Sequence, residues 1–167
     1  FSQLTLVCSS PGGKLLQEIW DQTKPKDNQN EISTSLIPEI EIIKETATFH
    51  IDNKFHLQLI PAATARWPGE LMAFEENLGL LMSDKFFGAH LYTKEWAEIT
   101  PFSTQEERRH YFDCLMSSMT TQIDSIIEQL EDLDIRIIAP GHGPAIEGSW
   151  RSLLNAYQRW GDLNEQN

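Results

Sequence analysis

Hydrophobic and polar residues alternate along much of the first half of the chain, which is typical of β-strands with one buried face. A glycine-containing turn at residues 9–13 separates the first strand from a short helical pattern at residues 14–20. A polar, turn-forming stretch at residues 21–31 indicates a surface loop, and residues 61–70 are expected to form a non-repetitive loop. The pattern predicts strands over residues 4–8, 40–42, 48–51, 55–59, 71–75 and 79–83.

The second half of the chain shows the spacing of three and four residues that is typical of amphipathic helices. Apolar positions over residues 112–130 predict one long helix, and residues 104–107 have the pattern of a capping box at its start. A β-branched run at residues 135–139 predicts a buried strand, and a final helix is expected over residues 150–160, ended by Gly161. Strands followed by helices predict an α/β chain of the layered α+β type, in which helices flank a sheet sandwich.

One histidine stands directly after the buried strand at residues 135–139. His142 follows Pro140 and Gly141 and precedes Gly143, so a tight turn can fix the direction of its ring. Glycine on either side would leave room for a ligand to approach the imidazole. The residues are compatible with a metal-binding or catalytic histidine at a sheet edge, and equally with an exposed turn histidine, because one histidine cannot make a metal site.

A second strand end carries residues that could contribute to a site. Asp84, Gly88 and His90 follow the strand at residues 79–83, and this stretch is either part of a sheet-edge site or a turn with a capping aspartate. His50 and His56 fall on polar strand positions and are interpreted as a solvated strand face rather than as metal ligands.

Composition restricts the possible partners and the compartment. The chain has 167 residues, enough for one domain with a core, and a net charge of −12 with a pI near 4.7. Such a charge disfavours nucleic acid and anionic membrane surfaces, and no apolar run is long enough to span a bilayer. Cys8 and Cys114 lack a metal-type or redox-type spacing and are expected to be reduced core residues in a cytosol-like compartment.

Three stretches together resemble a known family. They are Arg66-Trp67-Pro68-Gly69, residues 83–90 (SDKFFGAH) and residues 139–144 (APGHGP). In this order they resemble the metallo-β-lactamase-like domain of flavodiiron proteins, most closely the diflavin flavoproteins of oxygenic phototrophs. The resemblance implies a partial αββα sandwich. Residues 1–161 would be the C-terminal part of such a domain, and residues 162–167 a tail or linker toward a flavodoxin-like domain.

The resemblance also implies a site with two irons, which the sequence matches incompletely. His142 matches the late histidine ligand. Arg66 stands where the family has a histidine, and guanidinium offers no lone pair to a metal. The bridging aspartate corresponds to Lys85 without a gap and to Asp84 after a shift of one residue. His90 is expected near the metal rather than bound to it, and the family's early His-x-Glu-x-Asp-His motif is absent from this sequence.

The implied function is that of an electron-transfer oxidoreductase. The family binds iron and FMN and reduces oxygen to water, or nitric oxide, and the altered ligands predict a degenerate or absent diiron site. The subunit would act in a homo- or hetero-oligomer in the cytoplasm or the chloroplast stroma, and this part would be inactive alone. The alternatives are a non-catalytic scaffold or regulatory partner, and a metal hydrolase of the lactamase fold.

Overall fold

The computed structural model describes residues 4–23, 38–52, 54–64, 66–98 and 101–165. Strands fill most of the first half and helices cover most of the second, as the hydrophobic pattern predicts. The elements are β1 (Thr5–Ser9), α1 (Ser10–Thr23), β2 (Glu39–Ile43), β3 (Ala47–His50), β4 (His56–Pro61), β5 (Leu71–Glu75), β6 (Leu80–Asp84), β7 (Ala97–Glu98), the 3-10 helix η2 (Pro101–Thr104), α2 (Gln105–Leu115), α3 (Thr120–Glu131), β8 (Ile137–Pro140), β9 (Ala145–Glu147) and α4 (Trp150–Glu165).

Seven strands form one sheet in the order β3-β4-β5-β6-β8-β9-β7. Strands β3 to β6 pair antiparallel with their sequence neighbours, as expected for consecutive strands joined by short turns. The chain then passes through α2 and α3 before β8 returns parallel to β6. This crossover places the ends of β6 and β8 at the same edge of the sheet, which is important for the site described below. Strands β1 and β2 form a separate two-stranded parallel sheet.

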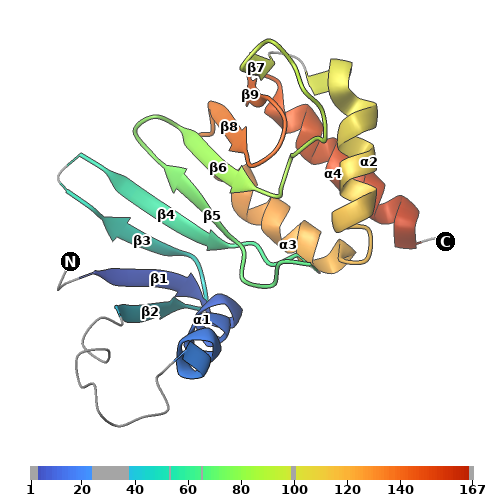
Figure 1. Cartoon of the computed structure of the whole chain (residues 1–167). Coiled ribbons are helices and arrows are strands. Elements are labelled where there is room, and N and C mark those ends of the chain that lie inside the picture. The colour runs from blue at the N-terminus through green and yellow to red at the C-terminus, as the bar shows by residue number, and fades with distance from the viewer. Residues whose placement is uncertain (1–3, 24–37, 53, 65, 99–100, 166–167) are drawn as a thin grey trace, which may run out of the picture.

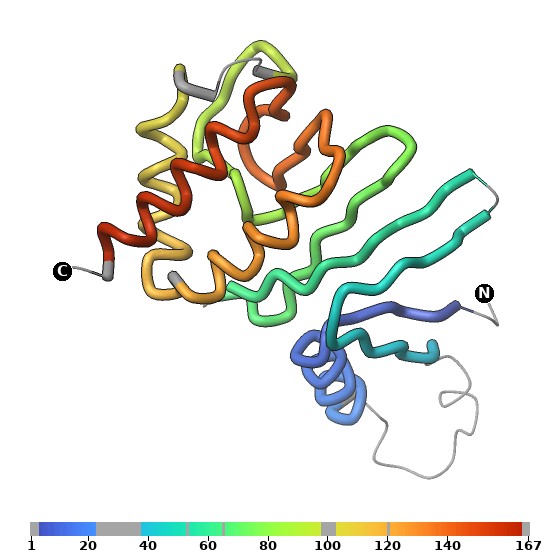
Figure 2. The backbone as a smooth tube through the Cα atoms, turned by 180° about the vertical axis from the view of Figure 1, so that it is seen from behind, coloured from blue at the N-terminus to red at the C-terminus, as the bar shows by residue number. Residues whose placement is uncertain are grey.

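The helices α2, α3 and α4 lie together on one side of the seven-stranded sheet (Figure 1). The apolar stripes of these helices meet alternate residues of the central strands, such as Met72 and Phe74 of β5 and Leu81 of β6. This contact is the main hydrophobic core. The opposite face of the sheet includes Met82, which is 38% exposed. Strands β1 and β2 and helix α1 lie at the β3 end of the large sheet in both views (Figures 1 and 2). The layered α/β fold expected from the sequence is therefore present.

The prediction of one long helix over residues 112–130 is wrong. Helix α2 ends at Leu115, and α3 begins at Thr120. The turn between them contains Ser117 and Ser118, and serine favours turns because its hydroxyl competes for backbone hydrogen bonds. The capping box is also wrong, because Thr104 makes no side-chain cap and its hydroxyl instead accepts a hydrogen bond from Arg108 Nε at 3.1 Å.

Other corrections concern element ends and burial. The predicted turn at residues 9–13 is largely helical, because α1 begins at Ser10. Gly161 does not end the last helix, since α4 continues to Glu165 and buries this glycine. Most of the loop predicted at residues 21–31 lies outside the described residues. Cys8 is only half-buried and Cys114 is exposed, so the prediction that both are core residues is wrong.

Candidate functional site

The loop after β6 and the turn after β8 lie side by side because their parent strands are parallel neighbours. Two backbone hydrogen bonds join these segments: Gly141 N donates to Asp84 O at 2.7 Å, and Ala89 N donates to His142 O at 3.1 Å. As a result, the ring centroids of His90 and His142 lie 5.5 Å apart and the rings are nearly perpendicular. The two histidines singled out at different strand ends therefore belong to one site.

The glycines on either side of His142 serve the packing of these two segments. A Cβ at Gly141 would lie 2.7 Å from Asp84 Oδ1, and a Cβ at Gly143 would lie 2.9 Å from Ala89 O. Gly143 also has a φ of 84°, a left-handed conformation that disfavours other residues. The sequence pattern predicts that these glycines leave room for a ligand, whereas in the structure neighbouring protein atoms lie beside them.

Replacing Gly143 by alanine is expected to destabilise the protein by about 2 kcal/mol, since the left-handed backbone alone costs about 1–2 kcal/mol for a residue with a Cβ. Chemical denaturation would measure the loss. Gly148→Ala is the matched control, because Gly148 has a similar φ of 80° and, among the described residues, no atom crowds its Cβ position. If both variants lose the same stability, the contact with Ala89 is not important.

An ion pair lies at the end of β6. Lys85 Nζ is 2.6 Å from Asp84 Oδ1, and the ammonium group also lies 5.5 Å from the centre of the Trp67 ring. Asp84 has a φ of 46°, which is unusual for a residue other than glycine, and such conformations are concentrated at functional sites. Asp84 and Lys85, the two alternatives for the position of the family's bridging aspartate, are thus direct partners.

A glutamate that the sequence analysis did not select is buried beside this ion pair. Glu70 immediately precedes β5, whose start lies beside the end of β6, and it is only 5% exposed. Its Oε1 accepts a hydrogen bond from Lys85 N at 2.7 Å, while Oε2 is buried and has no hydrogen-bond partner among the described residues. Burial raises the pKa of Glu70 to about 7, against the lowering effect of the Lys85 N–H. The only feature of the sequence that could have identified Glu70 as a site residue is its carboxyl group directly before a predicted strand.

Tyr111 of α2 completes the group. Its ring centroid lies 4.6 Å from that of His90 and 6.1 Å from that of His142. The side chain is fully buried, and its hydroxyl has no hydrogen-bond partner among the residues described. Burial, followed by the negative charges of Asp84 and Glu70, raises the pKa of Tyr111 to about 12. We call the six residues Glu70, Asp84, Lys85, His90, Tyr111 and His142 the strand-end cluster.

Arg66 is the predicted pocket residue that does not join the cluster through any observed contact. It is exposed, and within the described part of the chain it makes no hydrogen bond or ion pair. His50 and His56 are paired across β3 and β4, with ring centroids 4.6 Å apart, and His50 is exposed, in keeping with a solvated strand face.

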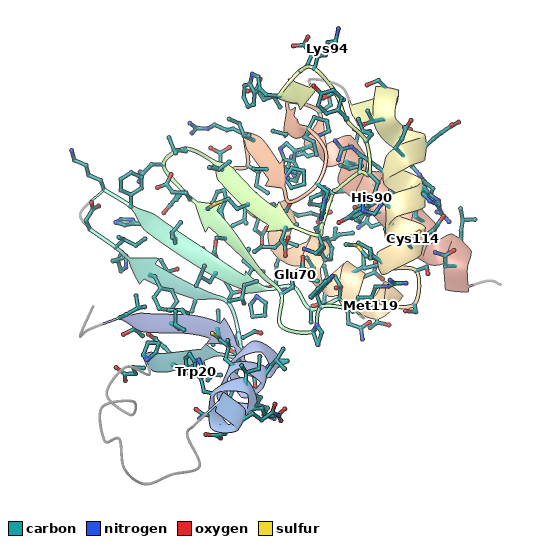
Figure 3. The ribbon with its side chains drawn as sticks, viewed as in Figure 1. Trp20, Glu70, His90, Lys94, Cys114 and Met119 are labelled. Atoms are coloured by element: carbon teal, nitrogen blue, oxygen red, sulfur yellow. The ribbon has the colours of Figure 1, made fainter. Side chains whose placement is uncertain are left out.

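Figure 3 labels Glu70 and His90, both on the side of the large sheet that faces α2.

The described residues do not by themselves provide a ligand set for two irons. Among them, no three histidine, cysteine, aspartate or glutamate side chains are arranged to hold a metal ion. The carboxylate of Asp84 is engaged by Lys85 instead. The strand-end cluster instead contains an ammonium group (Lys85), two carboxyls (Glu70 and Asp84), a phenol (Tyr111) and two imidazoles (His90 and His142). Groups of these types can donate or accept protons, and burial raises the pKa of the Glu70 carboxyl to about 7.

Comparisons with curated proteins reveal diflavin flavoproteins of cyanobacteria. The chain is 29% identical over 164 residues to diflavin flavoprotein A 3 of Synechocystis sp. and 30% identical over 163 residues to diflavin flavoprotein A 6 of Nostoc sp.. These matches include 98% and 95% of this chain, which spans about a quarter of the length of each relative.

In the described residues we find no helix with the length and apolar character needed to cross a bilayer.

Solved structures and a family model agree with this result. A fragment of diflavin flavoprotein A 5 from Nostoc sp. aligns with a TM-score of 0.79 at 26% identity, covering 97% of this chain and 58% of that one. The metal-soaked Flv1 flavodiiron core from Synechocystis sp. aligns with the same TM-score at 27% identity, covering 95% of this chain and 36% of that one. The model of the ODP family beta lactamases matches residues 30–143. The chain therefore belongs to the ODP family of beta lactamases and is homologous to the lactamase-like core of the diflavin flavoproteins.

Proposed function

We propose that this chain is part of a diflavin flavodiiron subunit that takes part in electron transfer and in the reduction of oxygen to water, and that its metal site is altered. Homology to diflavin flavoproteins over nearly the whole chain supports the general assignment. The ion pair between Lys85 and Asp84 is the observation that carries the altered site. By the resemblance, one of these two residues takes the position of the family's bridging aspartate, and the pairing would occupy that carboxylate or replace it with a cation.

The positive charge of Lys85 is the reason why its ion pair with Asp84 indicates an altered metal site. A diiron centre places several positive charges in its pocket, and surrounding carboxylates offset them. The Lys85 ammonium supplies one positive charge to Asp84 at 2.6 Å, and the backbone N–H of the same lysine donates to the buried carboxyl of Glu70. An ammonium group can replace part of the positive charge of a metal ion. Unlike iron, however, an ammonium group cannot be oxidised or reduced during electron transfer. A subunit of this type would contribute flavin electrons to a partner rather than reduce oxygen at its own pocket.

We further propose that the protein acts as a homo- or hetero-oligomer with another flavodiiron subunit in the cytoplasm or the chloroplast stroma. FMN and iron are the cofactors that the family brings to the complete assembly. In this chain His142 and, less directly, Asp84 are the residues that correspond to the family's metal ligands. By the resemblance, Arg66, Lys85 and His90 would line the remaining pocket. Of these, Arg66 is exposed and makes no contact with the strand-end cluster among the described residues.

Metal analysis of the full-length protein tests the altered site. Protein purified after growth with excess iron is expected to contain well below two irons per chain, measured by plasma emission spectroscopy. The double variant Arg66→His and Lys85→Ala should raise the iron content, because it removes two cations and restores one imidazole. Lys94→Ala is the control, since Lys94 is an exposed lysine of a neighbouring loop and its removal should change nothing. Two irons per chain in the parent would refute the altered site.

The same protein can separate electron transfer from a scaffold role. Oxygen consumption with a reduced nicotinamide donor should be low for the isolated protein and should rise when a flavodiiron partner with an intact site is added. A rise that requires the bound FMN of this protein supports electron transfer. If the rise is the same after its FMN is removed, the protein is a non-catalytic partner of the assembly.

A further inference from the structure

Arg108 is a fully buried arginine of α2 that lies beside the strand-end cluster without belonging to it. Its guanidinium donates to oxygens of η2, of the segment after β6 and of the turn after β8. Nε donates to the Thr104 hydroxyl at 3.1 Å, Nη1 makes a close hydrogen bond to Phe87 O, and Nη2 lies 3.5 Å from Pro144 O. The last two acceptors are backbone carbonyls of the segments that carry His90 and His142.

Two backbone hydrogen bonds, from Gly141 to Asp84 and from Ala89 to His142, also join these segments, and the rings of His90 and His142 lie close together. The Tyr157 hydroxyl holds the segment after β6 as well, since it accepts a hydrogen bond from Phe87 N at 2.7 Å. The end of β6 and the segment that follows it have two non-glycine residues with positive φ, Asp84 at 46° and Phe87 at 62°. Such a backbone persists only where its surroundings hold it in place. Arg108 contacts the carbonyl of one of these two residues.

The chemistry of arginine suits this task. The planar guanidinium directs its donors in a fixed fork, so one side chain can address two carbonyls at a set separation. A lysine ammonium at the same place has a flexible stem and a single nitrogen, so it cannot reproduce the fork. Because the group is shielded from water, its hydrogen bonds do not compete with solvent.

We propose that Arg108 is a positioning residue that holds the segment of His90 and the turn of His142 at a fixed separation and so sets the geometry of the strand-end cluster. This role does not rest on the proposed function, because it concerns the arrangement of the cluster whether or not the protein transfers electrons. The competing explanation is that Arg108 only fills the core and stabilises the fold as a whole.

Amide hydrogen exchange of the full-length protein distinguishes these roles. In Arg108→Met, exchange at residues 85–91 and 140–146 is expected to rise at least about tenfold, because two anchors of these segments are lost. Exchange in α3 should stay at the parent level, because α3 contains none of the three oxygens named above. An equal rise in all elements, or no rise in the two segments, would overturn the proposal.

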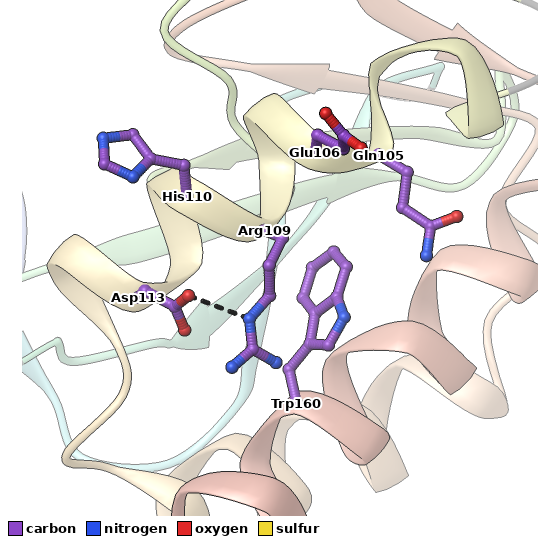
Figure 4. A pocket seen from close by; sticks show the side chains of 6 residues that line it. All are labelled: Gln105, Glu106, Arg109, His110, Asp113 and Trp160. Atoms are coloured by element: carbon purple, nitrogen blue, oxygen red, sulfur yellow. Dashed lines mark hydrogen bonds and ion pairs between the residues drawn. The ribbon is translucent and has the colours of Figure 1, made fainter.

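Two further variants keep the test decisive. Arg108→Lys is expected to fold and to raise exchange in at least one of the two segments severalfold, so an unchanged profile for this variant contradicts the proposal even if Arg108→Met does not fold. Arg109→Met is the matched control. Arg109 lies on the same helix in an open hollow of about 520 Å³ beside Trp160, where its Nε is 2.9 Å from Asp113 Oδ2 (Figure 4). Its removal should leave both segments as protected as in the parent, and a rise equal to that of Arg108→Met would refute the specific role of Arg108.

Discussion

Replacing Glu70 by glutamine is expected to make the protein more stable than the parent above pH 7 and to change little at pH 5. Burial raises the pKa of this carboxyl from 4.5 to about 7 in the folded protein. Between these values the folded state holds a proton that the unfolded chain has released, so the stability of the parent falls as the pH rises through this window. At about 1.4 kcal/mol per pKa unit the loss is about 3 kcal/mol above pH 7. Glutamine cannot ionise, so the Glu70→Gln variant does not undergo this loss of stability.

Urea denaturation at pH 5 and pH 8 measures this effect. Glu75→Gln is a useful control, because Glu75 also belongs to the β5 region and is buried, but a hydrogen bond from Leu78 N lowers its pKa. Its contribution to stability therefore depends on pH in the opposite sense and is lost as the pH falls. If Glu70→Gln and the parent show the same change in stability from pH 5 to pH 8, Glu70 is charged in the folded protein already at pH 5, and our account of its burial is wrong.

Shortening Tyr157 to alanine is expected to cost about 3–5 kcal/mol, the range for a large aromatic core residue. Tyr157 of α4 is fully buried, and its ring contacts Phe86, Phe112 and Trp160 at centroid distances of 5.0 to 6.1 Å. Its hydroxyl also accepts a hydrogen bond from Phe87 N at 2.7 Å. Tyr157→Phe keeps the packing but leaves this buried N–H unpaired, so a smaller loss of about 1–3 kcal/mol is expected.

Thermal and chemical denaturation of both variants provide the measurement. Tyr92→Phe and Tyr92→Ala are the controls, because Tyr92 is 91% exposed and its ring should contribute little to folding. The difference between the two Tyr157 variants separates ring packing from the hydrogen bond. A Tyr157→Phe variant as stable as the parent would mean that Phe87 N finds another acceptor and that Tyr157 does not support the segment after β6.

Short-range pattern was sufficient for many elements of the fold. The strand at residues 71–75 is observed with the predicted bounds, since turn residues flank a short apolar run that is too short for a helix. The helical pattern over residues 112–130 failed where Ser117 and Ser118 interrupt it, because the apolar spacing continues across the break and conceals the turn. Strands β7 and β9 have two and three residues, too few to show a period.

In the strand-end cluster, too, local sequence identified some features and left others to the tertiary structure. His142, Asp84, Lys85 and His90 could be selected from the sequence, because each follows a strand end and the motifs resemble a known family. The sequence could not show that Asp84 and Lys85 are partners at 2.6 Å, since this depends on side-chain directions in a left-handed turn.

The sequence by itself determined the α/β class, the two strand ends that carry polar residues and the family resemblance, because these depend on local spacing and on residue types. Only the tertiary structure decided that the parallel pairing of β6 and β8 brings His90 within 5.5 Å of His142. It also decided that Glu70, Arg108 and Tyr111 are buried beside them, since burial depends on which distant segments meet, and no local pattern encodes that.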